Sequence, residues 1–328
     1  MASTGIESAE RRFWRALWDR LRVPTWVSYA LLAVTVAVNA SLQPFFFTLY
    51  NIQSNLNTFV PLVAAAVGQT LVILGGGIDL SLGAIITLVD VVVVTLMEGS
   101  MERVPMALLA GLAVGGAAGL INGLLVAYVR LQPIVATFAT SFVWSGLALW
   151  VMPRPGGAVP RAFYRGYRDV FLGVPVAAWI ILGIILLWLI IKRHRITRYI
   201  LAVGGDERAA YASGVPVTKA KVMSYLLGGL FAGLAGLGIV ANTASGDPYV
   251  GGPITLQSIT AVVIGGTRLS GGAGGAGGSI AGAMILSLIG NIVFFANVGS
   301  HYQELINGAI VVLALALAGI PALRRRSA

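Results

Sequence analysis

The side chains that could perform chemistry are too few and too scattered in this chain to build a catalytic centre. The absence of cysteine excludes disulfides, thiolate nucleophiles and thiolate metal ligands. The two histidines, His194 and His301, lie far apart in the sequence. A nucleotide-binding P-loop needs Gly directly before Lys, whereas Lys192, Lys219 and Lys221 follow Ile, Thr and Ala. We therefore expect no enzyme and no cofactor bound by this chain itself.

The polar residues embedded in apolar stretches are better candidates for a functional role. Asp90 is the clearest ionisable one, with a structural role near an interface as its alternative. Neutral amides suit contact with a neutral, hydroxylated solute, although hydrogen bonding between helices competes as the explanation for each. The candidates for a permeation path or its gate are Asp79, Ser81, Asp90, Asn122, Asn242, Gln257, Arg268 and Ser270.

The elements that carry these residues are predicted to be membrane-spanning helices. Of the 328 residues 57% are hydrophobic and 10% charged, and the mean hydropathy is +0.88. A soluble globule of this composition would expose apolar surface, so we expect an all-α integral membrane protein with one domain and about ten spans. The predicted spans are 26–47, 56–74, 82–97, 104–129, 133–152, 172–191, 222–243, 252–266, 275–296 and 302–323. Spans 82–97 and 252–266 are short enough to be broken or re-entrant.

The charge distribution predicts the orientation of these spans. A net charge of +10 would suggest nucleic acid in a soluble protein, but here the basic residues lie between apolar spans and act as topology signals. With both termini in the cytoplasm, 17 of the 22 Lys and Arg lie inside. Residues 1–25 are predicted to be an amphipathic cytoplasmic leader, or else a solvated one, and residues 324–328 a basic cytoplasmic tail. The domain between them is 26–323.

The longest polar interruption, within 192–221, predicts a short surface helix at Glu207–Ser213. Gly204 and Gly205 are expected to break the preceding run, and Asp206 to accept hydrogen bonds from the first turn. Gly214 is expected to end the helix. This surface comprises Gly204, Gly205, Asp206, Glu207, Ala209, Ala210, Ser213 and Gly214. An ordinary connecting helix is the alternative.

Glycine patterns predict close helix packing and an internal repeat. Gly111, Gly115, Gly119 and Gly123 follow a four-residue series on one helical face, and 274, 278 and 282 repeat it. Residues 76–83 and 265–272 share the frame GG-x-x-LS-x-G. The first segment has Asp79 where the second has Arg268. We hypothesise that these two side chains lie near each other at the inner mouth of a path. An N-cap role is the alternative for Asp79.

Three segments together resemble the permease subunit of ribose-type monosaccharide ABC importers. They are GGGIDLSLG at 75–83, AVGGDERAAYASGV at 202–215, and SGDP at 245–248 with ITAVVIGGTRLSGG at 259–272. The resemblance covers most of the chain. It implies a bacterial inner-membrane protein that moves a monosaccharide or small polyol by alternating access, with 204–216 docking on a separate ATPase.

The same resemblance implies the partners. They are a second permease copy or paralogue, an ATPase with two nucleotide-binding halves that binds ATP-Mg, and an external sugar-binding protein; nucleic acid is not expected. The outer loop 153–171 offers Arg161, Arg165 and Arg168 as docking candidates for the binding protein. A permease for branched-chain amino acids of the same superfamily and an ion-coupled secondary transporter are the alternatives.

Overall fold

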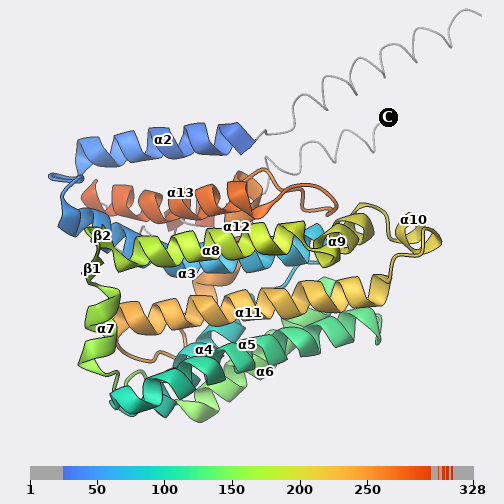
Figure 1. Cartoon of the computed structure of the whole chain (residues 1–328), viewed down its shortest axis with the longest axis horizontal. Coiled ribbons are helices and arrows are strands. Elements are labelled where there is room, and N and C mark those ends of the chain that lie inside the picture. The colour runs from blue at the N-terminus through green and yellow to red at the C-terminus, as the bar shows by residue number, and fades with distance from the viewer. Residues whose placement is uncertain (1–24, 297–301, 303–304, 307, 310–311, 313–328) are drawn as a thin grey trace, which may run out of the picture.

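The computed structural model describes residues 25–296 and residues 302, 305, 306, 308, 309 and 312. Within this part the long helices run roughly side by side (Figure 1), and the only strands are β1 Val170–Phe171 and β2 Val174–Pro175, which pair antiparallel. The helices are α2 Thr25–Leu42, α3 Leu49–Leu74, α4 Leu82–Met97, η1 Met101–Arg103, α5 Val104–Ala127, α6 Pro133–Val151, α7 Arg161–Tyr167, α8 Val176–Arg193, α9 Arg195–Gly205, α10 Glu207–Ala212, α11 Val217–Thr243, α12 Gly252–Ile264 and α13 Ala276–Phe295.

Six of the described helices are long and apolar enough to cross a membrane. They are α3, η1 with α5, α6, α8, α11 and α13, while α2, α4 and α12 are apolar but shorter. Nine of the ten predicted spans thus have a helix in the described part of the chain. The tenth span, the leader and the basic tail lie largely or wholly outside the described residues. The chain is a multi-pass membrane protein, and the total of ten spans with cytoplasmic termini stays a prediction.

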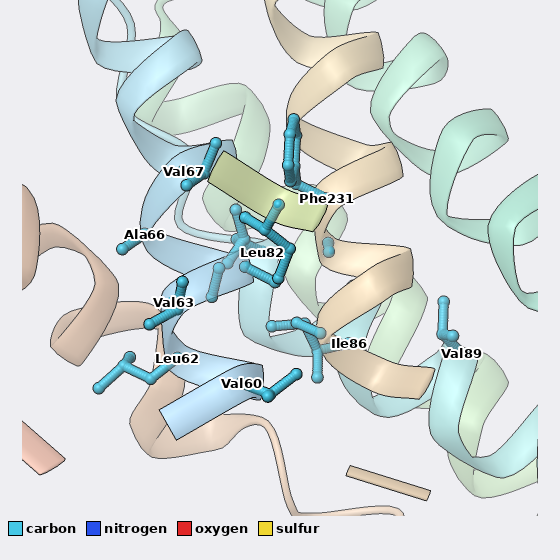
Figure 2. Packing of buried hydrophobic residues seen from close by; sticks show 14 of the residues in the cluster. Val60, Leu62, Val63, Ala66, Val67, Leu82, Ile86, Val89 and Phe231 are labelled. Carbon is cyan, nitrogen blue, oxygen red and sulfur yellow. The ribbon is translucent and has the colours of Figure 1, made fainter. Parts of the chain in front are cut away.

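The core of the bundle lies around α3, whose side chains from Phe59 to Leu74 are all buried. Figure 2 shows Val63 and Val67 of α3 close to Leu82 and Ile86 of α4 and Phe231 of α11. A helix that is apolar on every side is stable only when neighbours surround it. The centre of the bundle is therefore α3, α4 and α11.

Glycines bring α5 and α11 into backbone contact, as the four-residue series predicted. A Cβ at Gly119 would lie 2.3 Å from the Tyr225 carbonyl oxygen, and one at Gly115 would lie 2.5 Å from that of Gly229. Close approach maximises van der Waals contact, which drives helix association where lipid replaces water. In the second series, a Cβ at Gly278 would lie 1.9 Å from the carbonyl oxygen of Gly265, the C-cap of α12, and one at Gly282 would lie 2.2 Å from that of Ala261 in α12. Residue 274 lies in the loop before α13.

The two ends of the bundle carry different short elements. Helices α9 and α10 lie at one end, and α7 with the β1–β2 hairpin lies at the other (Figure 1). The sequence analysis missed α9, although Ile196, Ile200 and Val203 are buried at helical spacing. Gly204 and Gly205, expected to break the preceding run, form the last turn of α9, which ends where Asp206 adopts an extended conformation with φ −157°.

Candidate functional site

Helix α10 is a capped and largely exposed helix, as predicted. The Asp206 carboxylate accepts a hydrogen bond from the Ala209 N–H at 3.0 Å, which satisfies one of the free donors of the first turn. At the other end Gly214 has φ +77°, and the N–H of Val215 donates to the Ala210 carbonyl at 3.0 Å. The helix ends at Ala212, one residue before the predicted Ser213, which is its C-cap.

The last turn of α9 packs against two other parts of the bundle through glycine residues. A Cβ at Gly204 would lie 1.9 Å from the Leu74 carbonyl oxygen at the end of α3, and 2.8 Å from the Gly272 nitrogen. The Gly272 N–H donates to that same Leu74 carbonyl at 3.1 Å. A Cβ at Gly271 would lie 2.8 Å from the Gly76 Cα. We call this contact of Gly76, Gly204, Gly271 and Gly272 the glycine junction.

The glycine junction joins the two repeated segments, but their structural register differs from the predicted one. Gly76 and Gly266 each have positive φ, and the next residue donates to a carbonyl five residues back: Gly77 to Val72 at 3.1 Å and Thr267 to Val262 at 3.2 Å. Both segments therefore end a helix in the same Schellman turn. This alignment pairs Gly76 with Gly266, whereas the sequence frame pairs Gly76 with Gly265.

The structure gives Asp79 and Arg268 different environments. Asp79 is fully buried and forms no ion pair with Arg268, whose side chain is exposed, as is that of Ser270. Asp79 instead bonds to Ser81 in its own loop, whereas Arg268 occupies the place in its segment that corresponds to residue 78. Asp79 is not the N-cap residue of α4, which is Ser81, but its carboxylate accepts a hydrogen bond from the Ser81 N–H at 2.8 Å.

Asp79, Ser81 and Asn122 instead form one buried polar cluster between α3, α5 and α6. The Asp79 carboxylate accepts from the Ser81 hydroxyl at 2.7 Å, and the Asn122 amide donates to that hydroxyl at 2.7 Å and to Asp79 at 3.4 Å. Thr140 of α6 donates to the Asn122 amide oxygen at 2.8 Å. Buried polar groups need such partners in a membrane protein. The cluster therefore holds the α3–α4 loop against α5 and α6, and the sequence analysis missed Thr140.

The structure places Asp90 in contact with the segment that leads into α12. It is fully buried, and its Oδ2 accepts from the Asp247 N–H at 2.7 Å. Two further bonds connect the same segments: Gly251 donates to the Thr87 hydroxyl and Gly83 to that of Thr255, both at 2.9 Å. The short helix α4 is thus tied to the segment that leads into α12.

Asn242 and Gln257 line a cavity of about 320 Å³ between α3, α11, α12 and α13. Both are half-buried, and neither side-chain amide hydrogen-bonds to another described residue. Hydroxyls and apolar groups complete the wall, and none of the residues that line it is charged: Thr58, Pro61, Leu62, Ile239, Thr243, Val250, Ile254, Leu286, Ser287 and Gly290. Thr243 and Ser287 were not identified from the sequence, because their hydroxyls donate to carbonyls of their own helices.

Arg161, Arg165 and Arg168 lie in or beside α7, at the end of the bundle opposite α10 (Figure 1). All three side chains are exposed. Arg168 differs from the other two because its guanidinium donates to the backbone carbonyl of Asn242. The three arginines therefore share one surface but not one set of contacts.

Comparison with known proteins defines the class. Residues 51–315 match the family described as "Branched-chain amino acid transport system / permease component". The ribose import permease protein RbsC of Escherichia coli (strain K12) is 36% identical over 298 residues, which cover 88% of this chain and 91% of that protein. The RbsC of Bacillus subtilis (strain 168) is 36% identical over 290 residues, 87% and 90% of the two chains. No solved structure matches.

The bundle, its helices and these matches define a membrane permease. The D-allose transport system permease protein AlsC of Escherichia coli (strain K12) is also similar, with 30% identity over 303 residues, 92% of this chain and 91% of that one. The chain belongs to the family of permease components of sugar ABC importers, in the branched-chain amino acid transport superfamily.

Proposed function

We propose that this chain is the membrane-spanning subunit of an ATP-driven importer for a monosaccharide or small polyol, and that the cavity between α3, α11, α12 and α13 belongs to the path of the solute. The observation that carries the proposal is the chemistry of this cavity. Its wall offers the amides of Asn242 and Gln257 and three hydroxyls, and no charge. A pocket with a few polar groups on an apolar wall can orient a hydroxylated solute without holding it tightly.

The same wall argues against the two alternatives. A branched-chain amino acid carries an ammonium and a carboxylate, and desolvating both without charged partners is costly. An ion-coupled carrier usually places a buried carboxylate on the path. The buried carboxylates of Asp79 and Asp90 lie outside the cavity wall and accept hydrogen bonds from Ser81 and Asp247. A neutral solute is therefore the best match.

The energy would come from a separate ATPase with two nucleotide-binding halves that docks on the segment from Gly204 to Gly214, most of which is exposed. Three connections support a role for this surface in opening the cavity. Helix α10 is followed by α11, which carries Asn242. The glycine junction fastens α9 to the end of α3 and to the loop between α12 and α13. All four walls of the cavity are thus linked to the α9–α10 segment.

Alternating access follows from these connections if the ATPase holds two arrangements with different affinity. A displacement of α10 would move α11 directly and the other three walls through the glycine junction. Packed helices respond by rigid-body rearrangement rather than by continuous deformation. The cavity would then open to one side of the membrane at a time.

The complete importer would contain further partners. A second copy of this chain or a paralogue would complete the permease in the bacterial inner membrane, with the α9–α10 end in the cytoplasm. An external sugar-binding protein would deliver the solute to the α7 end, where the exposed Arg161 and Arg165 favour an acidic docking surface on that partner. The chain itself would bind no cofactor, and ATP-Mg would stay on the ATPase.

Reconstitution of the complete complex in proteoliposomes tests the proposal. We expect uptake of labelled ribose to require both ATP and the binding protein, to persist when ionophores remove ion gradients, and to exceed uptake of labelled leucine. Uphill transport by this chain alone on an ion gradient would contradict the proposal. Uptake of leucine but of no sugar would instead favour the amino acid permease.

A further inference from the structure

Helix α7 ends in two residues that bond to two different walls of the cavity. Tyr167 is buried, and its hydroxyl donates to the backbone carbonyl of Asn57 in α3 at 2.7 Å. A phenol is protonated at physiological pH, and burial raises the pKa of the Tyr167 phenol further, so its hydroxyl acts as a donor. Asn57 directly precedes Thr58, a residue of the cavity wall.

The next residue, Arg168, reaches the opposite wall. Its guanidinium donates to the carbonyl of Asn242, one residue before the end of α11, and lies 5.8 Å from the centre of the Tyr164 ring. The carbonyls at a helix C-terminus carry partial negative charge, which a cation stabilises. The backbone carbonyl of Arg168 in turn accepts from the side-chain amide of Gln53 in α3. Arg168 is therefore fixed to both α3 and α11.

These contacts make a connection between the surface of α7 and the cavity. Asn242 lines the cavity itself, and Asn57 adjoins a residue that does. A shift of α7 would thus change the separation of α3 and α11 at the outer end of the cavity. We refer to Tyr167 and Arg168 together as the α7 bridge.

We propose that the α7 bridge is the positioning element through which a docked binding protein sets the opening of the cavity, and that Arg168 is not a docking residue. The inference rests on the proposed function and assigns different roles to three arginines of the same surface. Arg161 and Arg165 lie on the exposed helix and would meet acidic side chains of the binding protein. Arg168 would convey the resulting movement to α3 and α11.

The two roles are separable in a titration of the reconstituted complex with the binding protein, because docking governs the half-saturating concentration and positioning governs the maximal rate. We expect Arg165→Gln to raise the half-saturating concentration, with uptake restored by excess binding protein. Arg168→Gln should lower the maximal uptake rate several-fold with an unchanged half-saturating concentration. Arg168→Lys keeps a cationic donor for the single carbonyl of Asn242 and should recover part of that rate.

A second variant tests the inference even if Arg168→Gln does not fold. Tyr167→Phe removes only the hydroxyl that bonds to Asn57, and we expect it to lower the maximal rate as Arg168→Gln does. An Arg168→Gln variant that shifts the half-saturating concentration as Arg165→Gln does, or a Tyr167→Phe variant that transports at the wild-type rate, would overturn the inference. Absence of ATP-dependent sugar uptake by the wild-type complex would contradict the proposed function instead.

Discussion

Replacement of Gly204 by Ala tests the proposed link between α10 and the cavity. The new Cβ would lie 1.9 Å from the Leu74 carbonyl oxygen, against an ordinary contact of at least 3.4 Å. Helix α9 must therefore move away from α3 by about 1.5 Å, the difference of those two distances, because the opposing atoms are backbone and no rotamer change can make room. The shift would separate the α9–α10 segment from α3 and from Gly272.

The adjacent Gly205 provides a matched control. A Cβ there would meet only the Gly272 Cα, at 3.9 Å, which is an ordinary contact. Both glycines lie in the last turn of α9, and neither has positive φ. Alanine is favoured over glycine by about 1 kcal/mol in a helix, so Gly205→Ala should be neutral or slightly stabilising. Overpacking at Gly204 costs about 1–3 kcal/mol, which exceeds or cancels that gain.

The assay compares sugar uptake with ATP hydrolysis in proteoliposomes that contain the complete complex. We expect Gly204→Ala to assemble with the ATPase, because Gly204 is half-buried against α3 and the exposed residues of α10 are unchanged, but to import less sugar for each ATP hydrolysed. Gly205→Ala should keep the wild-type ratio. A wild-type ratio in Gly204→Ala, or equal impairment of both variants, would refute the link through the glycine junction.

Three further variants test other contacts. Asp206→Ala removes the cap of α10, at a cost of about 0.5–2 kcal/mol, and should reduce co-purification of the ATPase, whereas Asp206→Asn keeps an acceptor and should retain it. Asn242→Leu removes one amide from the cavity and should lower sugar uptake by about two- to tenfold, the equivalent of one hydrogen bond of about 0.5–1.5 kcal/mol, while the amount of assembled complex stays unchanged. Gly119→Ala places a Cβ 2.3 Å from the Tyr225 carbonyl oxygen and should lower the thermal stability in detergent by about 1–3 kcal/mol, whereas Gly146→Ala, which meets nothing within 4 Å, should not.

Local features of the fold were predictable from the sequence because each depends on neighbouring residues. Long apolar runs between basic segments gave the spans, and Asp206 with Gly214 gave the ends of α10. The series that contains Gly115 and Gly119 predicted close packing, since the spacing of the glycines shows which helical face lacks side chains. The partner helix, α11, was not predictable from that series alone.

The arrangement of the candidate site depends on long-range packing and was mostly not predictable. Asp79 forms no ion pair with Arg268, because its carboxylate is buried and bonded to Ser81 and Asn122 while Arg268 is exposed. The Schellman turns also align the repeat one residue later than sequence identity does. Asn242 and Gln257 were identified as polar residues in apolar spans, but the cavity they share requires four helices at defined angles. Hydroxyls such as that of Ser287 donate to a carbonyl of their own helix, so nothing in the sequence marks them as residues of a cavity wall.

The central claim is that a cavity near one end of the bundle is opened and closed by an ATPase at the other end. The chain has no cysteine, so Gln257→Cys introduces a single thiol into the cavity wall. Its rate of reaction with a membrane-impermeant maleimide, added from outside, can be measured in the complete complex with and without trapped ATP. We predict that the rate differs between the two states and that the difference disappears when the ATPase is absent. Equal rates in both states of the complete complex would contradict the account.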